Sequence, residues 1–165
     1  MDIALTIPEL LRLAAPAGLP PGIGTPTLVG DTLTTDVDPR ALSDLPTAAR
    51  LAARAAGNVT VTVRVLRLSS GVAVLDVTAS ARSLPAHRLV GLLLGTVENA
   101  LRNALVVRGV RGDAVRVRPD GPRLEALVDT AALLAPAPLP PHLRGLGVAG
   151  LRLGDGRIHV EVTLP

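Results

Sequence analysis

Residues 83–108, SLPAHRLVGLLLGTVENALRNALVVR, form the stretch on which the rest of the chain depends. It is the one long helical segment that the sequence predicts, and β-rich sequence stands on both sides of it. Pro85 suits the first turn of a helix, where its missing N–H is not needed. Gly109 predicts the end, because glycine readily adopts the left-handed conformation that terminates helices. We therefore expect one helix of about six turns over residues 85–107.

The two halves of this helix differ in character. From Leu89 to Leu94 the segment is apolar on nearly every face, apart from Gly91. After Val97 it becomes amphipathic, with Val97, Leu101 and Leu105 on one stripe. One end is thus expected to be buried in protein and the other to lie on a surface.

Two glycines stand inside the predicted helix. Gly91 and Gly95 are four residues apart and so share one helix face. Each costs about 1 kcal/mol relative to alanine in a helix interior. We therefore expect a packing reason for them, namely the close approach of a strand that carries Ala79 and Ala81.

The composition indicates a single globular domain over residues 1–165, large enough to bury a substantial core. Of its residues 48% are hydrophobic, none is aromatic and none is cysteine. The core must therefore be aliphatic, and disulfides, thiolate nucleophiles and cysteine-ligated metals are excluded. All 17 basic residues are arginine, which is typical of a GC-rich bacterial gene. The net charge is only +3, so the high pI does not by itself indicate nucleic-acid binding.

The sequence also predicts where the protein resides. The start, MDIALTIPELL, carries Asp2 and Pro8 and has no basic segment, so we do not expect a signal peptide. The longest uncharged apolar run of the helix, Leu89–Val97, is about half of the roughly 20 residues that a membrane span needs. We expect a cytoplasmic protein with no membrane span, and peripheral membrane contact is compatible with this.

Alternating residues and turn signals predict the remaining elements. The clearest pair, VTVTVRVLR at 59–67 and GVAVLDVTASAR at 71–82, should form adjacent antiparallel strands. Further hairpin turns are expected at Gly30-Asp31 and Asp155-Gly156. The other predicted elements are strands at 2–7, 27–29, 32–37, 115–118, 124–128, 143–153 and 157–164, and helices at 8–15, 44–56 and 130–135, the last capped by Asp129.

The two ends of the chain look alike. Each has a strand, a short leucine-rich helix, a link with Leu-Pro-Pro, and a hairpin with Gly-Asp at its turn. We interpret this as a degenerate β-α-β-β repeat, with coincidence in a proline- and leucine-rich composition as the alternative. The expected fold class is α+β: a curved antiparallel sheet of hairpins packed around one long central helix.

No motif in the chain announces catalysis. The three histidines, His87, His142 and His159, have no metal-binding spacing and are expected on solvated surfaces. Asp36 and Asp38 could form a carboxylate pair for acid–base work, but the adjoining proline favours a solvated loop. Phosphate-binding glycine loops and nucleophile motifs are missing. We therefore expect no enzyme activity, no cofactor and no metal.

A basic stretch follows the long helix. It includes Arg108, Arg111, Arg116 and Arg118, diluted by Asp113. Such side chains could contact phosphates of nucleic acid or of lipid headgroups. Nucleic acid is disfavoured because no aromatic side chain is present to stack a base. A solvated surface is the first interpretation and lipid headgroup contact is the second.

The C-terminal third resembles a known family. RLEALVDTAALL, then PLPPHLRGLGVAGLRL, then GDGRIHVEVTL is similar to the end of the LmeA-like actinobacterial family, which has been linked to the tubular lipid-binding superfamily. There too a strand leads to a short leucine-rich helix, a Leu-Pro link and a closing hairpin with Asp-Gly at its turn. The resemblance covers about the last 45 residues. It implies a protein that binds lipid.

Two functions remain open from the sequence. The first is a non-enzymatic binding protein for a lipid or other apolar ligand, because a helix that is apolar all round, without aromatic residues to fill the remaining space, could leave an apolar cavity. The second is a structural or interaction module, such as a homodimer, in which the same residues form a dry core or a dimer seam. The predicted apolar site consists of Leu75, Val77, Leu89, Val90, Leu93, Leu94 and Val97, with headgroup contact from Arg108, Arg111, Arg116 and Arg118.

Overall fold

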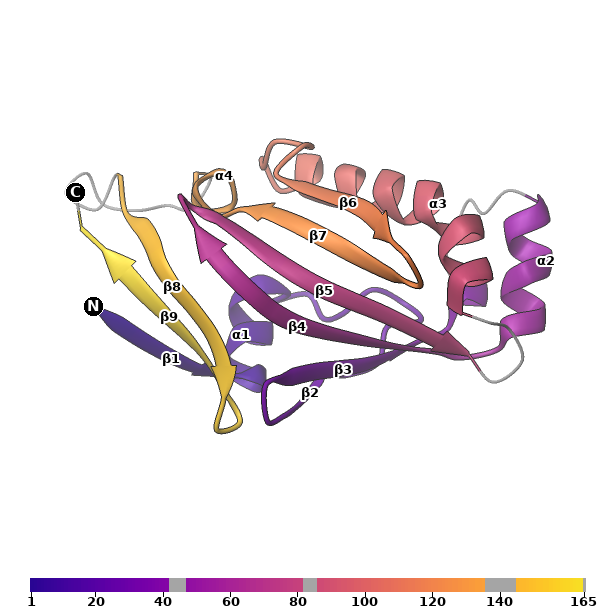
Figure 1. Cartoon of the computed structure of the whole chain (residues 1–165), viewed down its shortest axis with the longest axis horizontal. Helices are drawn as coiled ribbons and strands as arrows, with labels where there is room; N and C mark the ends of the chain where they lie inside the picture. Colours follow the sequence, from indigo (N-terminus) through magenta and orange to yellow (C-terminus); the bar gives the residue numbers. More distant parts are fainter. Residues whose placement is uncertain (42–46, 82–85, 136–144, 165) are drawn as a thin grey trace.

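The computed structural model describes residues 1–41, 47–81, 86–135 and 145–164 and shows a protein built mainly of β-strands (Figure 1). The described strands are β1 (Asp2–Thr6), β2 (Thr27–Val29), β3 (Thr32–Val37), β4 (Val59–Ser69), β5 (Val72–Ala81), β6 (Val115–Asp120), β7 (Arg123–Asp129), β8 (Gly147–Gly154) and β9 (Arg157–Thr163). The described helices are α1 (Ile7–Ala14), α2 (Thr47–Ala56), α3 (Ala86–Val107) and α4 (Thr130–Leu134), with a 3-10 turn at Pro39–Ala41.

The strands form two antiparallel sheets. The larger sheet has the order β2-β3-β4-β5-β7-β6, and the smaller has the order β1-β9-β8. β4 and β5 are the longest strands, and they pair from Val59 opposite Ala81 to Ser69 opposite Val72. This confirms the predicted hairpin. A bulge between Val65 and Arg67 interrupts the register and leaves Leu66 exposed.

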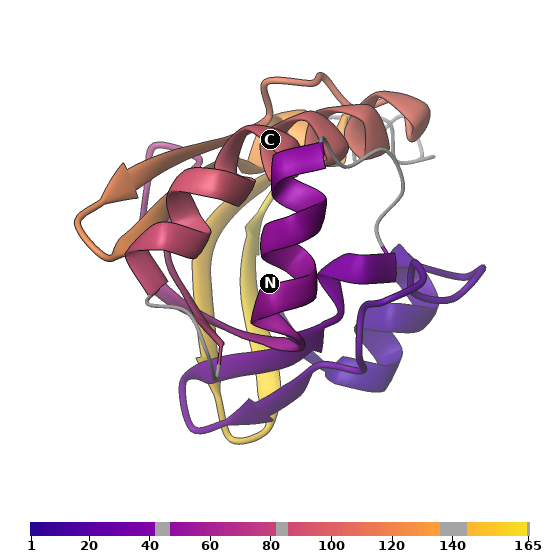
Figure 2. The same cartoon turned by 90° about the vertical axis from the view of Figure 1, so that its right-hand side faces the viewer.

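The two faces of the larger sheet differ in chemistry because successive side chains alternate between them. The apolar inner face carries Val61, Val63 and Val65 of β4, paired across the strands with Ala79, Val77 and Leu75 of β5. The intervening positions, such as Thr62 opposite Thr78 and Arg64 opposite Asp76, form a polar outer face. The helices cover the inner face, and Figure 2 shows the sheet curving with α2 at one end and the smaller sheet behind.

Three hydrophobic clusters of described residues hold the covering elements in place. Leu105 of α3 packs with Val110, Ala114 and Ala132 near α4. Ala56 of α2 packs on the β4–β5 hairpin. The third cluster joins the two sheets through α1, and its members are Ile7, Leu153 and Ile158, with Leu10, Leu11, Leu28, Leu33, Val65, Leu151 and Val160 packed against them.

The predicted helix is present but is not central. α3 spans Ala86–Val107, and its packing contacts on the sheet fall on β5, β6 and β7 at one end of the strand order. The expected fold class, a single curved sheet around one long central helix, is therefore wrong. Strands dominate, and they form two separate sheets. Satellite elements α1 and α2 cover the inner face that α3 leaves free.

The element order of the expected repeat occurs at both ends, as β1-α1-β2-β3 and β7-α4-β8-β9, but the two units do not form one sheet around a central helix. The N-terminal hairpin β2–β3 belongs to the larger sheet, whereas the C-terminal hairpin β8–β9 belongs to the smaller one. β1 pairs with β9, from Asp2 opposite Glu161 to Thr6 opposite Arg157. Strands from the two ends of the chain thus belong to one sheet. The backbone N–H and C=O groups along one edge of β9 are hydrogen-bonded to β1.

The end of α3 follows the expected pattern. Gly109 has a φ of +75°, in the left-handed region that favours glycine. The amide of Val110 donates to the carbonyl of Leu105 at 2.9 Å, and that of Gly109 donates to the carbonyl of Val106 at the same distance. Pro85, the expected start, lies outside the described residues. No described helix is long and apolar enough to cross a membrane.

The prediction that a strand packs against Gly91 and Gly95 is wrong. Both residues are exposed, and a Cβ added to either would meet no atom within 4 Å among the described residues. The glycines therefore weaken the helix without allowing a close contact. The small residues Ala79 and Ala81 instead face Ala56 of α2.

Gly91→Ala and Gly95→Ala should each stabilise the protein by about 1 kcal/mol, because alanine raises helix propensity and its methyl group meets open space. Thermal or urea unfolding measures the change. Gly22→Ala is the control in the opposite direction: its φ is +86°, and an added Cβ would stand 2.7 Å from the carbonyl oxygen of Asp38. A destabilised Gly91→Ala would show that another group packs on this face.

Candidate functional site

The candidate site is the part of the inner face that lies beneath α3. Leu75 and Val77 of β5 lie on this face, and Leu94 lies on α3; all three are half-buried. The remaining candidates, Leu89, Val90, Leu93 and Val97, are on α3, but their side chains lie outside what the structure describes. The candidate residues whose side chains the structure describes thus lie on β5 and α3, and these two elements pack together.

An apolar band crosses the sheet at this point. Leu75 pairs with Val65 on one side and with Ala126 of β7 on the other, and the row continues to Val117 of β6. A second row passes through Val77, and its members are Val63, Val77, Leu124 and Pro119. No polar side chain stands in either row. Such a surface can hold a hydrocarbon by burial alone, without a polar anchor.

The band is incompletely buried although it lies under α3. Val63, Leu75, Val77, Val117 and Leu124 are all half-buried. Ala126 is the exception, with 6% of its surface exposed. Among the described residues, Pro39 is the largest side chain that is fully buried. The short aliphatic side chains thus leave accessible apolar area on this face.

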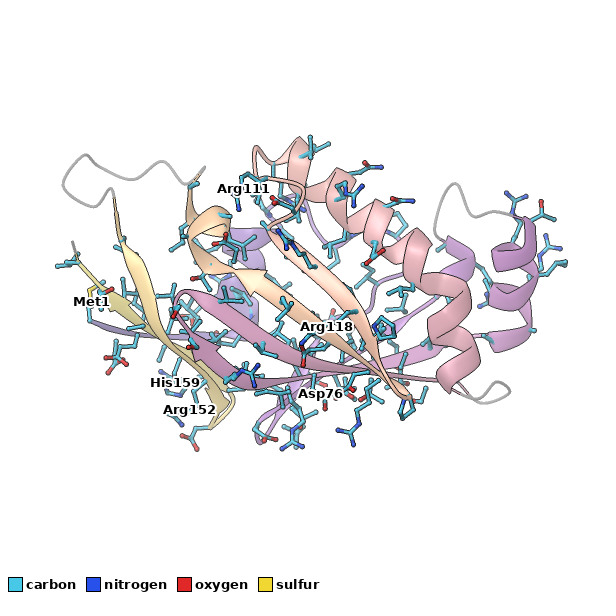
Figure 3. All side chains as sticks on the ribbon, turned by 45° about the horizontal axis from the view of Figure 1, so that its top comes forward. Met1, Asp76, Arg111, Arg118, Arg152 and His159 are labelled. Atoms are coloured by element: carbon cyan, nitrogen blue, oxygen red, sulfur yellow. The ribbon has the colours of Figure 1, made fainter. Side chains whose placement is uncertain are left out.

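The arginines proposed for headgroup contact do not gather beside this band. Arg116 and Arg118 pair across the strands with Leu127 and Glu125, so they lie on the outer face of the sheet. Arg118 Nε donates to Glu125 Oε1 at 2.7 Å. A ligand on the inner face would not reach these two arginines. Asp76 of β5 stands in the same row, opposite Glu125, and Figure 3 labels both Arg118 and Asp76.

Arg111 and Arg116 instead line a small pocket at the end of the larger sheet. Its volume is about 270 Å³. Arg111 lies 3.0 Å from Asp129 and 3.3 Å from Asp113, and Arg116 lies 3.5 Å from Asp113. The two guanidinium groups are thus balanced by two carboxylates. Arg108 is exposed and has no such partner within the described chain.

Asp129 has two roles at this pocket. One carboxylate oxygen accepts from the amide of Ala132 at 3.0 Å and caps α4, while the other faces Arg111. Asp129→Ala should therefore destabilise the protein by about 1 kcal/mol through loss of the cap. Asp129→Asn keeps an acceptor for the Ala132 amide, so its loss of stability should be smaller. Equal melting temperatures for the two variants would contradict a capping role.

Sequence reasoning did not predict the two larger pockets. One, of about 650 Å³, lies between α1 and the proline-rich loop after it, and its lining is mostly apolar: Leu11, Arg12, Ala15, Pro16, Gly18, Leu19, Ile23 and Thr25. The other, of about 630 Å³, lies at the end of α2 and is more polar. The run of glycine and proline at 16–26 was the available signal, because such a loop cannot pack as closely as a helix.

The carboxylates singled out from the sequence have separate partners. Asp36 accepts from the Thr60 hydroxyl at 2.7 Å, whereas Asp38 is held by the side chain of Arg40 at 2.7 Å. Hydrogen bonds from the Arg40 side chain lower the pKa of Asp38 below its usual range. In the same way, the Arg64 guanidinium lowers the pKa of Asp31. Asp31 and Asp38 form surface ion pairs and Asp36 a hydrogen bond with Thr60, so these carboxylates share no acid–base centre.

His159 differs from the solvated histidine that was expected. It stands on β9 opposite Arg152 of β8, and both are labelled in Figure 3. Its Nε2 atom is buried and has no hydrogen-bond partner among the described residues. His142 lies outside the described residues, as does the side chain of His87. Within the described part of the chain, no three metal-ligating side chains come together.

Comparison with models of known protein families, with curated proteins and with solved structures gives no match.

Proposed function

We propose that the protein is a non-enzymatic binding protein for a lipid or other apolar ligand. The single observation that carries this is the half-buried aliphatic band beneath α3, centred on Leu75 and Val77. An acyl chain laid along this band would cover side chains that the protein's own core leaves accessible. Each buried methylene would contribute about 0.8 kcal/mol, so a chain of more than about ten methylenes is needed for micromolar affinity once the cost of association is included.

The chemistry of the surrounding residues supports a ligand that needs no polar recognition. The two rows of the band contain only aliphatic side chains, and the arginines nearest in the sheet point to the other face. The resemblance of the C-terminal third to the LmeA-like family favours the same function. The described carboxylates and the one described histidine side chain are not grouped as acid–base catalysis requires.

A fluorescent fatty acid tests this proposal. Emission should rise and saturate at one probe per chain, and unlabelled fatty acid should displace it. Val77→Asp should remove saturable binding, because a carboxylate in the band cannot be buried beside hydrocarbon. Val29→Asp, at a position 76% exposed on β2, is the matched control and should bind normally.

The competing interpretation is a homodimer in which the band forms a seam or a dry core. Sedimentation of the ligand-free protein separates the two. A monomer with saturable probe binding supports the proposal. A stable dimer that takes up no probe, and that Val77→Asp dissociates, would replace it.

A further inference from the structure

The C-terminal end of α3 exposes apolar side chains that no core packing explains. Val106 is 58% exposed and Val107 is 87% exposed. They follow the buried Leu105, whose side chain belongs to the core at this end. We define the α3 tip as Arg102, Val106, Val107 and Arg108. Figure 1 shows this end of α3 at the edge of the molecule, far from α2.

The sequence around the α3 tip is basic. Residues 99–112 contain three arginines and no acidic residue. Within the described chain, Arg102 and Arg108 have no ion-pair partner, whereas Arg111 is paired with Asp113 and Asp129. The two unpaired guanidinium groups therefore remain available to an external anion.

The tip is a packed surface and not a frayed end. A Cβ added at Gly112 would stand 2.7 Å from Cγ of Arg102 and 3.4 Å from Cγ2 of Val106. The loop after α3 therefore lies against both side chains. Val110, two residues before this glycine, is buried in the core and anchors the loop. A methyl group of Val106 and the stem of Arg102 thus lie against the same loop.

Cations at a helix C-terminus complement its dipole, which accounts for Arg108 alone. The dipole does not account for two exposed valines beside it. Exposed aliphatic groups flanked by arginine are suited to a membrane interface, where the apolar groups enter the headgroup boundary and the cations meet anionic phosphates. Nucleic acid offers the phosphates but no apolar layer for the valines.

We propose that the α3 tip docks on the surface of an anionic lipid bilayer, with Val106 and Val107 inserted and with Arg102 and Arg108 on the headgroups. This site lies outside the apolar band and does not depend on ligand binding there. Few groups take part, so attachment should be weak and reversible. Each arginine near such a surface strengthens attachment about fivefold.

Co-sedimentation with vesicles tests the proposal. The full chain should sediment with vesicles of equal parts phosphatidylcholine and phosphatidylglycerol, and not with phosphatidylcholine alone. Arg108→Gln should weaken binding about fivefold, and Val107→Ser should weaken it further. The matched controls are Arg67→Gln on β4 and Val29→Ser on β2, which are exposed elsewhere and should bind as the native chain does.

Three results would overturn the proposal. They are equal binding to both vesicle types, equal loss in the tip and control variants, and tip-dependent binding to a DNA oligonucleotide that exceeds binding to vesicles. Native mass spectrometry of the Val107→Ser variant keeps this test separate from the proposed function. Retention of a fatty acid by a variant that has lost vesicle binding would show that the two sites are independent.

Discussion

Replacing Leu94 by aspartate should abolish binding of a fatty acid while the protein stays folded. Leu94 is the described member of the apolar candidates on α3, and it is only half-buried. In the ligand-free protein the new carboxylate can keep contact with water. With an acyl chain bound it would lose that contact at a cost of several kcal/mol, which corresponds to a loss of affinity of about 100-fold or more.

A matched control separates this effect from damage to the fold. Leu66→Asp makes the same chemical change on β4, at a bulge position that is 57% exposed. It should leave both the affinity and the melting temperature nearly unchanged. Fluorescent fatty-acid titration and circular dichroism measure the two quantities. If Leu94→Asp binds the probe as tightly as Leu66→Asp does, the ligand does not lie beneath α3.

Ile158→Ala should produce the largest loss of stability, about 2–5 kcal/mol. Ile158 is 8% exposed and stands at the centre of the cluster that joins the smaller sheet, α1 and the larger sheet. It lies in the middle strand of its sheet, between Leu5 of β1 and Leu153 of β8. Truncation therefore leaves a cavity that neighbours on both sides cannot easily fill.

Chemical denaturation measures this change, with Leu164→Ala as the control. Leu164 lies near the chain end and is 59% exposed, so its truncation should cost little. A single unfolding transition that moves to lower denaturant in Ile158→Ala would show that the two sheets unfold together. A two-step transition with only one step affected would contradict the shared core.

The local elements could be predicted from the sequence because their signals are local. Period-two alternation marked β4 and β5, and the turn at Asp155-Gly156 joins β8 and β9 as expected, with Asp155 at a φ of +53°. The Asp129 cap on α4 was also predicted and is confirmed by its hydrogen bond to Ala132. Turn and cap chemistry involves only neighbouring residues, so one sequence suffices.

The assembly of the elements could not be predicted in the same way. Nothing local in Ile3 or Leu5 indicates that β1 pairs with β9, more than 150 residues away. Likewise, the apolar half of α3 does not indicate whether a sheet surrounds the helix or lies along one side. That choice depends on α1, α2 and the smaller sheet covering the rest of the inner face.

The candidate site was partly predictable for a related reason. The face of Leu75 and Val77 follows from strand alternation, and so does the opposite placement of Arg116 and Arg118 from Val115 and Val117. Grouping all the arginines as one headgroup site ignored this alternation. The exposure of Val106 and Val107 could not be predicted, because the sequence does not distinguish a buried apolar residue at a helix end from an exposed one.

The most direct test is native mass spectrometry of the freshly purified protein, followed by solvent extraction of the same sample. If the band beneath α3 holds a lipid, the intact mass should exceed the mass of the chain by that of a single ligand, and extraction should release a molecule with an alkyl chain. The Leu94→Asp variant should carry none. A native protein that matches its sequence mass, releases nothing and acquires no adduct when incubated with fatty acid would contradict the account.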